Sequence, residues 1–300
     1  MRIAVAGSSG LIGTKLVQSL RSKGHTVVRI VRVKADIGKD QVGIFWEPET
    51  NYINPDNLEN FDSIINLCGE KIASFNPFKA PSQSIRSSRI STNLLISRII
   101  SKLNNPPRYF IAASAYGYYK ASNIDNNLIT EDSAPGNGFL SQLAMEWEEA
   151  SRFYQTPYTK IINLRLGNVL DKKSIFLKTL SKLSKLKIKS IGDGEQSWPW
   201  VSIDDVVGVV EFIINSNYLE GPINVVSPQL TSAEEFMQTI SRKINTKGYI
   251  KLSSLIIKIT TNNLTEKILL NNYPITPTKL TINNYNFKIP SLKEAVNEYL

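Results

Sequence analysis

The chain has 300 residues, 42% of them hydrophobic, which is enough to bury the core of a large α/β domain and excludes a disordered protein. Its 35 lysines and arginines outnumber its 26 aspartates and glutamates and give a net charge of +9. No run approaches the roughly 18 apolar residues of a membrane span. The first predicted strand starts at residue 2, and the single cysteine, Cys68, cannot form an internal disulfide. We therefore expect a cytoplasmic protein that binds neither nucleic acid nor membrane.

The first thirty residues have the pattern of a strand, a glycine turn and a helix. An apolar run over residues 2–6 leads into Gly7, Gly10 and Gly13. Gly7 permits the sharp turn, Gly10 lets the backbone approach phosphates, and Gly13 lets the helix pack closely. The first N–H groups of such a helix point at a pyrophosphate. The predicted dinucleotide-binding residues are Gly7, Ser8, Ser9, Gly10, Leu11, Ile12 and Gly13.

The end of the second predicted strand, Thr26–Val31, indicates which dinucleotide is bound. An acidic residue at this place accepts the ribose hydroxyls of NAD, whereas an arginine accommodates the 2′-phosphate of NADP. No carboxylate occurs between residues 27 and 34, while Arg29, Arg32 and Lys34 are cationic. A two-pronged contact from a guanidinium is worth about 1.5–3 kcal/mol, which predicts a roughly 10- to 100-fold preference for NADP. We assign Val31 and Arg32 to the cofactor site. The alternative is that Arg32 is only a solvated strand-end residue.

Further strand-like runs occur at residues 63–67, 109–113 and 159–164, separated by helical patterns or long connections. This alternation predicts a Rossmann-like α/β fold, a doubly wound parallel sheet with a smaller C-terminal substrate lobe. We expect residues 1–171, with 201–227 returning to them, to form the NADP-binding domain. Residues 172–200 and 228–300 would form the substrate lobe.

Several motifs follow one another in a fixed order. They are Asp62–Glu70, Arg86–Thr92, Ser114–Tyr119, Phe139-Leu140 with Trp147-Glu148, Arg165–Leu170, Gly192–Gln196 and Trp200–Asp205. In this order and spacing the chain resembles the epimerase-like branch of the atypical short-chain dehydrogenase/reductase superfamily, often labelled nucleoside-diphosphate-sugar epimerases. The tail, with Pro277–Leu280 and Phe287–Pro290, resembles the C-terminal domain of unknown function of that branch.

The resemblance adds a second set of cofactor residues. It implies that Leu67, Cys68 and Gly69 line the adenosine and ribose side, that Arg89 reaches toward the cofactor, and that Val169 lies near the nicotinamide. Glu70 and Arg165, from the same motifs, are assigned to the cofactor site with them. Arg89 can also be interpreted as a surface arginine on the polar face of a helix.

The catalytic residues are harder to assign. In catalytically competent relatives, a tyrosine and a lysine four residues apart on a helix work with a serine at the end of the preceding strand. Ser114 fits the serine, but the predicted helix has only a hydrophobic stripe, Phe139, Leu143 and Trp147. Tyr116 and Lys120 have the spacing, yet they directly follow a strand, where such side chains need not meet.

Other groups in this region complete the set of catalytic candidates. Besides Ser114 they are Tyr118 and Tyr119, in the loop after the strand at the ligand-binding edge of the sheet. Glu131 and Glu148 are acid/base groups or structural residues. One histidine, His25, and one cysteine give neither a Ser-His-Asp triad near Ser114 nor a transition-metal site.

The second half contains features with two interpretations. Seven lysines between Lys172 and Lys189 predict an amphipathic helix whose cationic face is either solvated or attracts a phosphorylated ligand. The loop Gly192–Gln196, flanked by Trp198 and Trp200, either clamps a ring or packs. Ser202 and Ser291 are predicted helix N-caps.

Two classes of function follow from the sequence. The first is an NADP-dependent oxidoreductase or epimerase acting on a nucleotide-linked or phosphorylated small molecule, possibly a nucleotide sugar. The second is an NADP(H)-binding regulatory protein with little or no turnover. The sequence does not indicate an oligomeric state.

Overall fold

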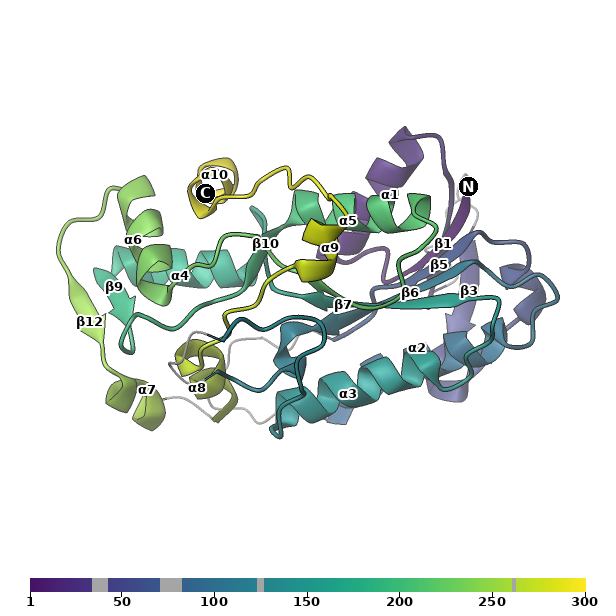
Figure 1. Ribbon diagram of the computed structural model, residues 1–300, viewed down its shortest axis with the longest axis horizontal. Coiled ribbons are helices and arrows are strands. Elements are labelled where there is room, and N and C mark those ends of the chain that lie inside the picture. Colours follow the sequence, from purple (N-terminus) through teal and green to yellow (C-terminus); the bar gives the residue numbers. More distant parts are fainter. Residues whose placement is uncertain (34–42, 71–82, 123–126, 261–262) are drawn as a thin grey trace.

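A central sheet organises the computed structural model, which describes residues 1–33, 43–70, 83–122, 127–260 and 263–300 (Figure 1). Within these residues the sheet has eight strands in the order β11-β7-β6-β5-β1-β2-β3-β4. Neighbouring strands are parallel except for the antiparallel pair β3 and β4. The predicted Rossmann-like α/β fold is therefore confirmed.

The strands of the main sheet alternate with helices along the chain. These strands are β1 (Arg2–Ala6), β2 (Thr26–Val31), β3 (Gly43–Glu47), β4 (Tyr52–Ile53), β5 (Ser63–Asn66), β6 (Tyr109–Ala115), β7 (Lys160–Leu166) and β11 (Gly221–Val225). Two small sheets pair β8 (Asn168–Leu170) with β10 (Trp200–Ser202), and β9 (Ile188–Ile191) with β12 (Ile250–Leu252).

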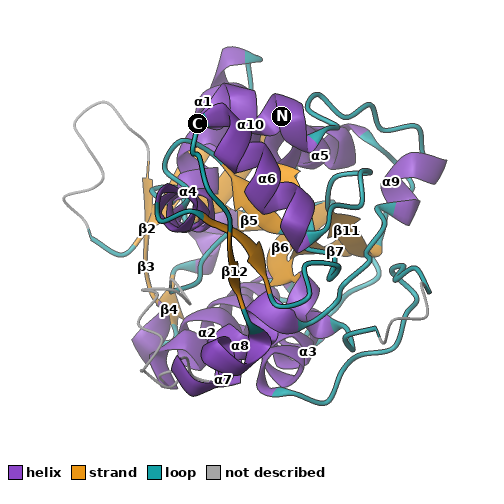
Figure 2. Cartoon of the chain, turned by 90° about the vertical axis from the view of Figure 1, so that its left-hand side faces the viewer, coloured by secondary structure: helices purple, strands orange, loops and turns teal. Residues whose placement is uncertain are grey.

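The helices cover both faces of the main sheet and build the second half of the chain. They are α1 (Leu11–Ser22), α2 (Gln83–Ile100), α3 (Phe139–Arg152), α4 (Ile175–Lys185), α5 (Ile203–Asn215), α6 (Ala233–Lys243), α7 (Ser254–Thr260), α8 (Asn263–Leu270), α9 (Thr278–Ile282) and α10 (Leu292–Tyr299). Figure 2 shows the strands between a layer that contains α1 and α5 and a layer that contains α2 and α3. In the part of the chain that the structure describes, no helix is both long and apolar enough to cross a bilayer.

Two hydrophobic clusters fix these layers to the sheet. On one face, Leu16 and Leu20 of α1 and the apolar residues of α5 pack on β1, β5, β6, β7 and β11. On the other face, Leu95 and Ile99 of α2 pack on the same sheet with Trp46 and Phe110. Burial of apolar surface on both faces of a parallel sheet explains why its strands are almost uniformly hydrophobic.

The order of the strands places a crevice at one edge of the sheet. The chain passes from β1 outward to β2, and β5 then pairs with the opposite side of β1. Such a reversal leaves a crevice outside the carboxyl ends of the two strands, where ligands bind in open α/β sheets. The glycine loop after β1 and the residues after β5 lie at this point.

The structure differs from the expectations at several element boundaries. Two short strands, β3 and β4, were not predicted. β5 ends one residue early, at Asn66, whereas β6 and β7 run on to Ala115 and Leu166. The Ser202 hydroxyl caps α5 by accepting the Asp205 N–H at 2.8 Å, and Ser291 caps α10. The division into a cofactor domain and a substrate lobe stays a prediction.

Candidate cofactor and active site

The glycine loop after β1 is shaped by steric contacts at two of its three glycines. Gly7 has φ +73°, and a Cβ there would lie 2.6 Å from the Leu67 carbonyl carbon. A Cβ on Gly13 would lie 2.2 Å from the Gly7 oxygen. A Cβ on Gly10 would meet only that same oxygen, at 3.3 Å, so the rest of its surroundings is open. Gly7 and Gly13 are required by packing, whereas Gly10 leaves room for an incoming group.

The start of α1 has unsatisfied donors. Gly10 is the N-cap, no side chain caps the helix, and its first turn contains no acidic residue. The Thr14 N–H donates to the Gly10 carbonyl at 3.0 Å, so the N–H groups before it have no intrahelical acceptor. Ser9 and Leu11 are exposed here, while Ile12 packs on the core. Such a helix end favours an anion.

Two arginines lie near this loop at the end of β2. The Arg29 Nε donates to the hydroxyl of the buried Ser8 at 3.0 Å, which places its guanidinium against the glycine loop. Arg32 follows the buried Val31, and its side chain is 70% exposed and lies 3.9 Å from the Glu49 carboxylate. A contact that long and exposed restrains the side chain little. Lys34 lies outside the described residues.

The loop after β5 forms the opposite wall of the crevice. The Leu67 N–H donates to the Ala6 carbonyl at 3.0 Å, and the Cys68 N–H to the Asn66 side chain at 3.1 Å. Burial raises the pKa of the Cys68 thiol to about 12, so it stays protonated at neutral pH. Cys68 is therefore a wall residue and not a nucleophile.

Arg89 lies beneath the next turn of this loop and is 5% exposed. Its guanidinium donates to the carbonyls of Ile85 and Glu70, each at 2.8 Å, and a Cβ on Gly69 would lie 3.2 Å from its central carbon. Its Nε has no partner within the described chain. Burial lowers the pKa of Arg89 to about 10, against the opposing effect of Glu70. Arg89 is therefore not a surface arginine.

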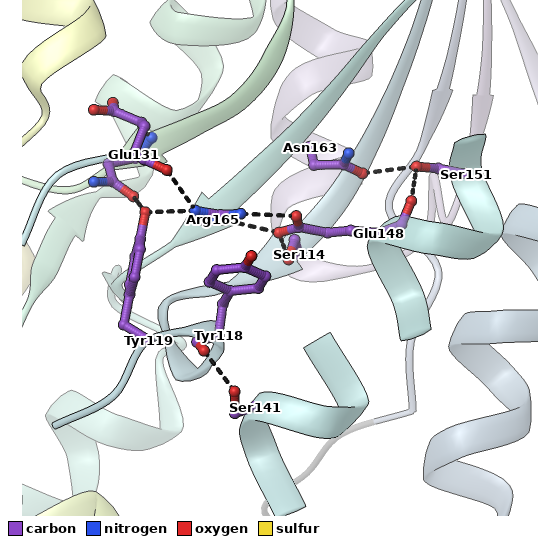
Figure 3. A network of polar contacts seen from close by, with 10 residues as sticks. Ser114, Tyr118, Tyr119, Glu131, Ser141, Glu148, Ser151, Asn163 and Arg165 are labelled. Carbon is purple, nitrogen blue, oxygen red and sulfur yellow. Dashed lines mark hydrogen bonds and ion pairs between the residues drawn. The ribbon is translucent and has the colours of Figure 1, made fainter. Parts of the chain in front are cut away.

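A second polar cluster joins β6, β7 and α3 (Figure 3). The Nε and Nη2 of Arg165 donate to the two carboxylate oxygens of Glu148, at 2.8 and 2.9 Å. Both side chains are almost fully buried, with exposures of 3% and 0%. Burial alone would lower the pKa of Arg165, but Glu148 outweighs it and raises that pKa. The pair holds strand and helix together.

The three predicted catalytic residues surround this ion pair. The Ser114 hydroxyl donates to Glu148 at 2.8 Å. The Tyr119 hydroxyl donates to Asn224 at 2.6 Å and accepts from Arg165 at 2.8 Å. Burial raises the pKa of Tyr119 to about 12, although Arg165 lowers it. The Tyr119 phenol is thus buried, and its hydroxyl group already has two partners.

Tyr118 differs from its neighbour. Its ring centroid lies 3.5 Å from the Arg165 guanidinium, and its side chain is half-buried. Its backbone carbonyl accepts from Ser141, as Figure 3 shows. Its hydroxyl has no hydrogen-bond partner among the residues that the structure describes. Of the three candidates, Tyr118 alone offers a free hydroxyl group.

The two glutamates named as acid/base groups have structural partners. Glu131 accepts the N–H groups of Asn224 and Lys279, at 3.1 and 3.2 Å, and burial raises its pKa. Glu148 is held by Arg165 and Ser114. Tyr116 stands at the start of a 3-10 turn, Tyr116–Tyr118, so it does not share an α-helix with Lys120.

In the second half of the chain, the structure decides whether the loop Gly192–Gln196, with its flanking tryptophans, clamps a ring or packs. Trp198 and Trp200 are 2% and 1% exposed and pack against Phe236, and Gln196 is buried with them. The loop packs and does not present a clamp. The lysine-rich stretch forms α4 with Lys178, Lys182 and Lys185 on its exposed side. Val169 lies on β8, partly buried between two clusters.

The predicted residues therefore form two groups. Gly7–Gly13, Leu67 and Arg89 lie around the β1–β5 crevice, whereas Ser114, Tyr118, Tyr119 and Arg165 gather at the ends of β6 and β7 and in the turn after β6. Sequence reasoning missed the pairing of Arg165 with Glu148 and the role of Asn224. The only signal for the pair was the acidic residue at the end of the Trp147-Glu148 motif.

The model of the NAD dependent epimerase/dehydratase family matches residues 3–226. Epimerase family protein Mb2239 of Mycobacterium bovis is 32% identical, over 98% of this chain and 96% of its own length. The crystal structure of human epimerase family protein SDR39U1 with NADPH is similar over 100% of this chain and 99% of that one, with a TM-score of 0.86 and 28% identity. A UDP-glucose 4-epimerase of Thermotoga maritima, 16% identical with a TM-score of 0.76, shares the fold.

Proposed function

The chain belongs to the NAD dependent epimerase/dehydratase family, and we propose on this basis that it binds NADPH and is an oxidoreductase or epimerase-like enzyme. Its substrate would be a nucleotide-linked or phosphorylated small molecule. Bound NADPH supplies a hydride to such a substrate, and NADP takes one up. The enzyme class is favoured over a binding protein by the fold and by the polar cluster after β6.

The observation that carries the proposal is the open start of α1. Gly7 and Gly13 are fixed by packing, Gly10 is open on one side, and within the described structure the helix has no side-chain cap and no acidic residue in its first turn. A diphosphate fits this arrangement because it accepts hydrogen bonds from the free N–H groups and complements the helix dipole. The NADPH in the human relative supports the same cofactor here.

The preference for NADPH over NADH would come from the end of β2. Among the described residues, Glu49 at 3.9 Å is the one ion-pair partner of the exposed Arg32, so its guanidinium is available to a 2′-phosphate. Arg29 lies beside the glycine loop through Ser8 and adds a second positive charge. A carboxylate at this place would instead repel the phosphate.

The residues that meet the substrate would come from the loop after β6. We assign the polarising contact to the Tyr118 hydroxyl, because it has no partner in the described structure and its ring is fixed on Arg165. Ser114, held by Glu148, and Tyr119, held by Asn224, would orient this loop and the groups bound to it. Val169 would lie against the nicotinamide, as the family resemblance implies.

One observation favours the alternative, an NADP(H)-binding regulatory protein. Helix α3 contains no tyrosine and lysine pair, and its inward residues Leu143 and Trp147 are buried core. The positive charge of Arg165, which lies next to Tyr118, is already neutralised by the ion pair with Glu148. A protein built in this way can hold a nucleotide without fast proton transfer.

The first experiment measures binding of NADPH and NADH to the wild type and to Arg32→Ala by nicotinamide fluorescence. We expect wild type to prefer NADPH by about 10- to 100-fold and the variant to lose most of this preference. Glu49→Gln is the matched control, because it removes only the partner of Arg32. An equal affinity for both cofactors in the wild type would refute the assignment.

The second experiment separates the enzyme from the regulatory protein. Protein loaded with NADPH or NADP is incubated with pooled sugar phosphates and nucleotide sugars, while nicotinamide absorbance and sugar stereochemistry are followed. Turnover that falls in Tyr118→Phe, with NADPH affinity unchanged, supports the enzyme. Tight NADPH binding without a change in either signal supports the regulatory protein.

A further inference from the structure

A cavity of about 510 Å³ opens beside the loop after β6. Its walls come from three segments: the loop from Gly117 to Ala121, the chain from Gly136 into the first turn of α3, and the end of α8. The aromatic rings of Tyr119, Phe139 and Tyr273 supply its apolar wall. The cavity therefore adjoins the residues that we assign to substrate, yet it lies on the α3 side and not at the glycine loop.

The charged groups of this cavity all have one sign. Lys120 comes from the loop after β6 and Lys267 from α8, and both side chains are exposed. Neither ammonium group has an ion pair or a hydrogen bond with any described residue, and the described lining contains no aspartate or glutamate. The neutral polar side chains of the described lining include those of Asn137, Ser141 and Asn271.

The start of α3 adds to this positive potential. Gly138 is the N-cap of this 14-residue helix, no side chain caps it, and its first turn contains no acidic residue. A Cβ on Gly138 would lie 3.6 Å from the Lys267 Nζ, so an ammonium group stands directly over the positive end of the helix dipole. Figure 1 shows α8 beside this end of α3. Two lysines in the lining and an uncapped helix start give this cavity a positive potential that favours an anion.

We infer that this cavity binds the phosphate of the substrate, between Lys120, Lys267 and the first N–H groups of α3. A dianionic phosphate matches the charge of two ammonium groups, and the rings of Tyr119 and Phe139 can cover the organic part of the ligand. This inference rests on the proposed function and deepens it, because it names the charged part of the substrate and where it lies. Phosphate recognition is thereby assigned to the loop that carries Tyr118 and not to the lysines of α4, which face solvent.

Isothermal titration calorimetry on protein saturated with NADPH tests this inference. Saturating cofactor fills the glycine loop, so that any phosphate bound in addition occupies another site. The probes are glucose 1-phosphate, UDP-glucose and glucuronate, which present a phosphate monoester, a diphosphate and a carboxylate. We expect one-to-one binding of at least one phosphate probe, weaker at higher salt, and no comparable binding of glucuronate.

Substitutions of three lysines, singly and in one pair, locate the binding site. Lys120→Ala and Lys267→Ala should each lower the affinity for the phosphate probe about three- to tenfold, and the double variant should lower it further. Lys182→Ala, an exposed lysine on α4, should leave it unchanged. All three should keep the wild-type NADPH affinity and the wild-type unfolding transition, because each removes an exposed side chain.

Several results would overturn the inference. These are the absence of binding by both phosphate probes, equal binding of glucuronate, or a loss in Lys182→Ala as large as in Lys267→Ala. The NADPH titration that precedes each experiment reports on the proposed function alone. Failure at that step refutes the cofactor assignment, and the probes are then titrated without cofactor with the same expected ranking.

Discussion

The buried ion pair between Arg165 and Glu148 leads to a quantitative prediction for Glu148→Gln. The substitution keeps the volume of the side chain but removes its charge, and one end of the new amide is a donor that faces the guanidinium. Arg165, 3% exposed, then has no carboxylate partner within the described chain. A buried charge that loses its partner costs about 3–5 kcal/mol of unfolding free energy. Urea denaturation followed by tryptophan fluorescence measures this loss.

The same helix supplies the control. Glu146, two residues earlier, forms an ion pair with Arg86 in which both side chains are more than a third exposed. Glu146→Gln should cost less than about 1 kcal/mol, because solvent screens such a pair. In the background of Glu148→Gln, Arg165→Met should restore part of the stability, since it removes the unpaired charge. If Glu148→Gln cost no more than Glu146→Gln, the pair would not hold β7 and α3 together as we argue.

Three further predictions concern α1 and its neighbours. Gly10→Ala should lower NADPH affinity at least about tenfold while leaving the unfolding transition nearly unchanged, because its Cβ fills the open side of the loop. Gly13→Ala should instead lower the unfolding free energy, since its Cβ would lie 2.2 Å from a backbone oxygen, and an unchanged transition would contradict this packing. Burial would raise the pKa of Asp204, but hydrogen bonds, first among them that from Lys15 at 2.7 Å, hold this pKa below its usual value. Asp204→Asn should therefore destabilise the protein at pH 7 by up to about 1 kcal/mol, and in urea titrations this difference should close as the pH falls below about 4.

The features that the sequence predicts correctly are those that depend on neighbours along the chain. The glycine turn after β1, the cap at Ser202 and the hydrophobic stripe of α3 each follow from a few consecutive residues. The doubly wound sheet follows from the alternation of such segments. Steric limits, hydrogen bonding and hydrophobic periodicity within a few residues determine these features, so they can be predicted without knowledge of the tertiary contacts.

The partners of the polar residues depend instead on contacts between distant segments. Arg165 was assigned to the cofactor from its motif, yet its side chain is used by Glu148 on α3 and by Tyr119. Tyr118 and Tyr119 are adjacent and equivalent in the sequence, but the Tyr119 phenol is buried with two partners, whereas the Tyr118 hydroxyl has none among the described residues. No periodicity distinguishes them, because the short turn after β6 is not regular enough to fix which side chain faces inward.

Because α3 contains no tyrosine and lysine pair, the groups that could react with a substrate must be sought elsewhere in this fold. On α3, residues that would carry a phenol and an amine in active relatives are replaced by core residues, and the next polar group, Glu148, is neutralised by Arg165. We therefore expect a proton donor or acceptor for a substrate to come from the turn after β6, where the Tyr118 hydroxyl has no partner among the described residues. The chain continues from that turn to Lys120, one of the residues that line the cavity at the start of α3. One short segment thus carries both the proposed reacting group, on Tyr118, and the proposed phosphate contact, on Lys120, two residues apart in the sequence.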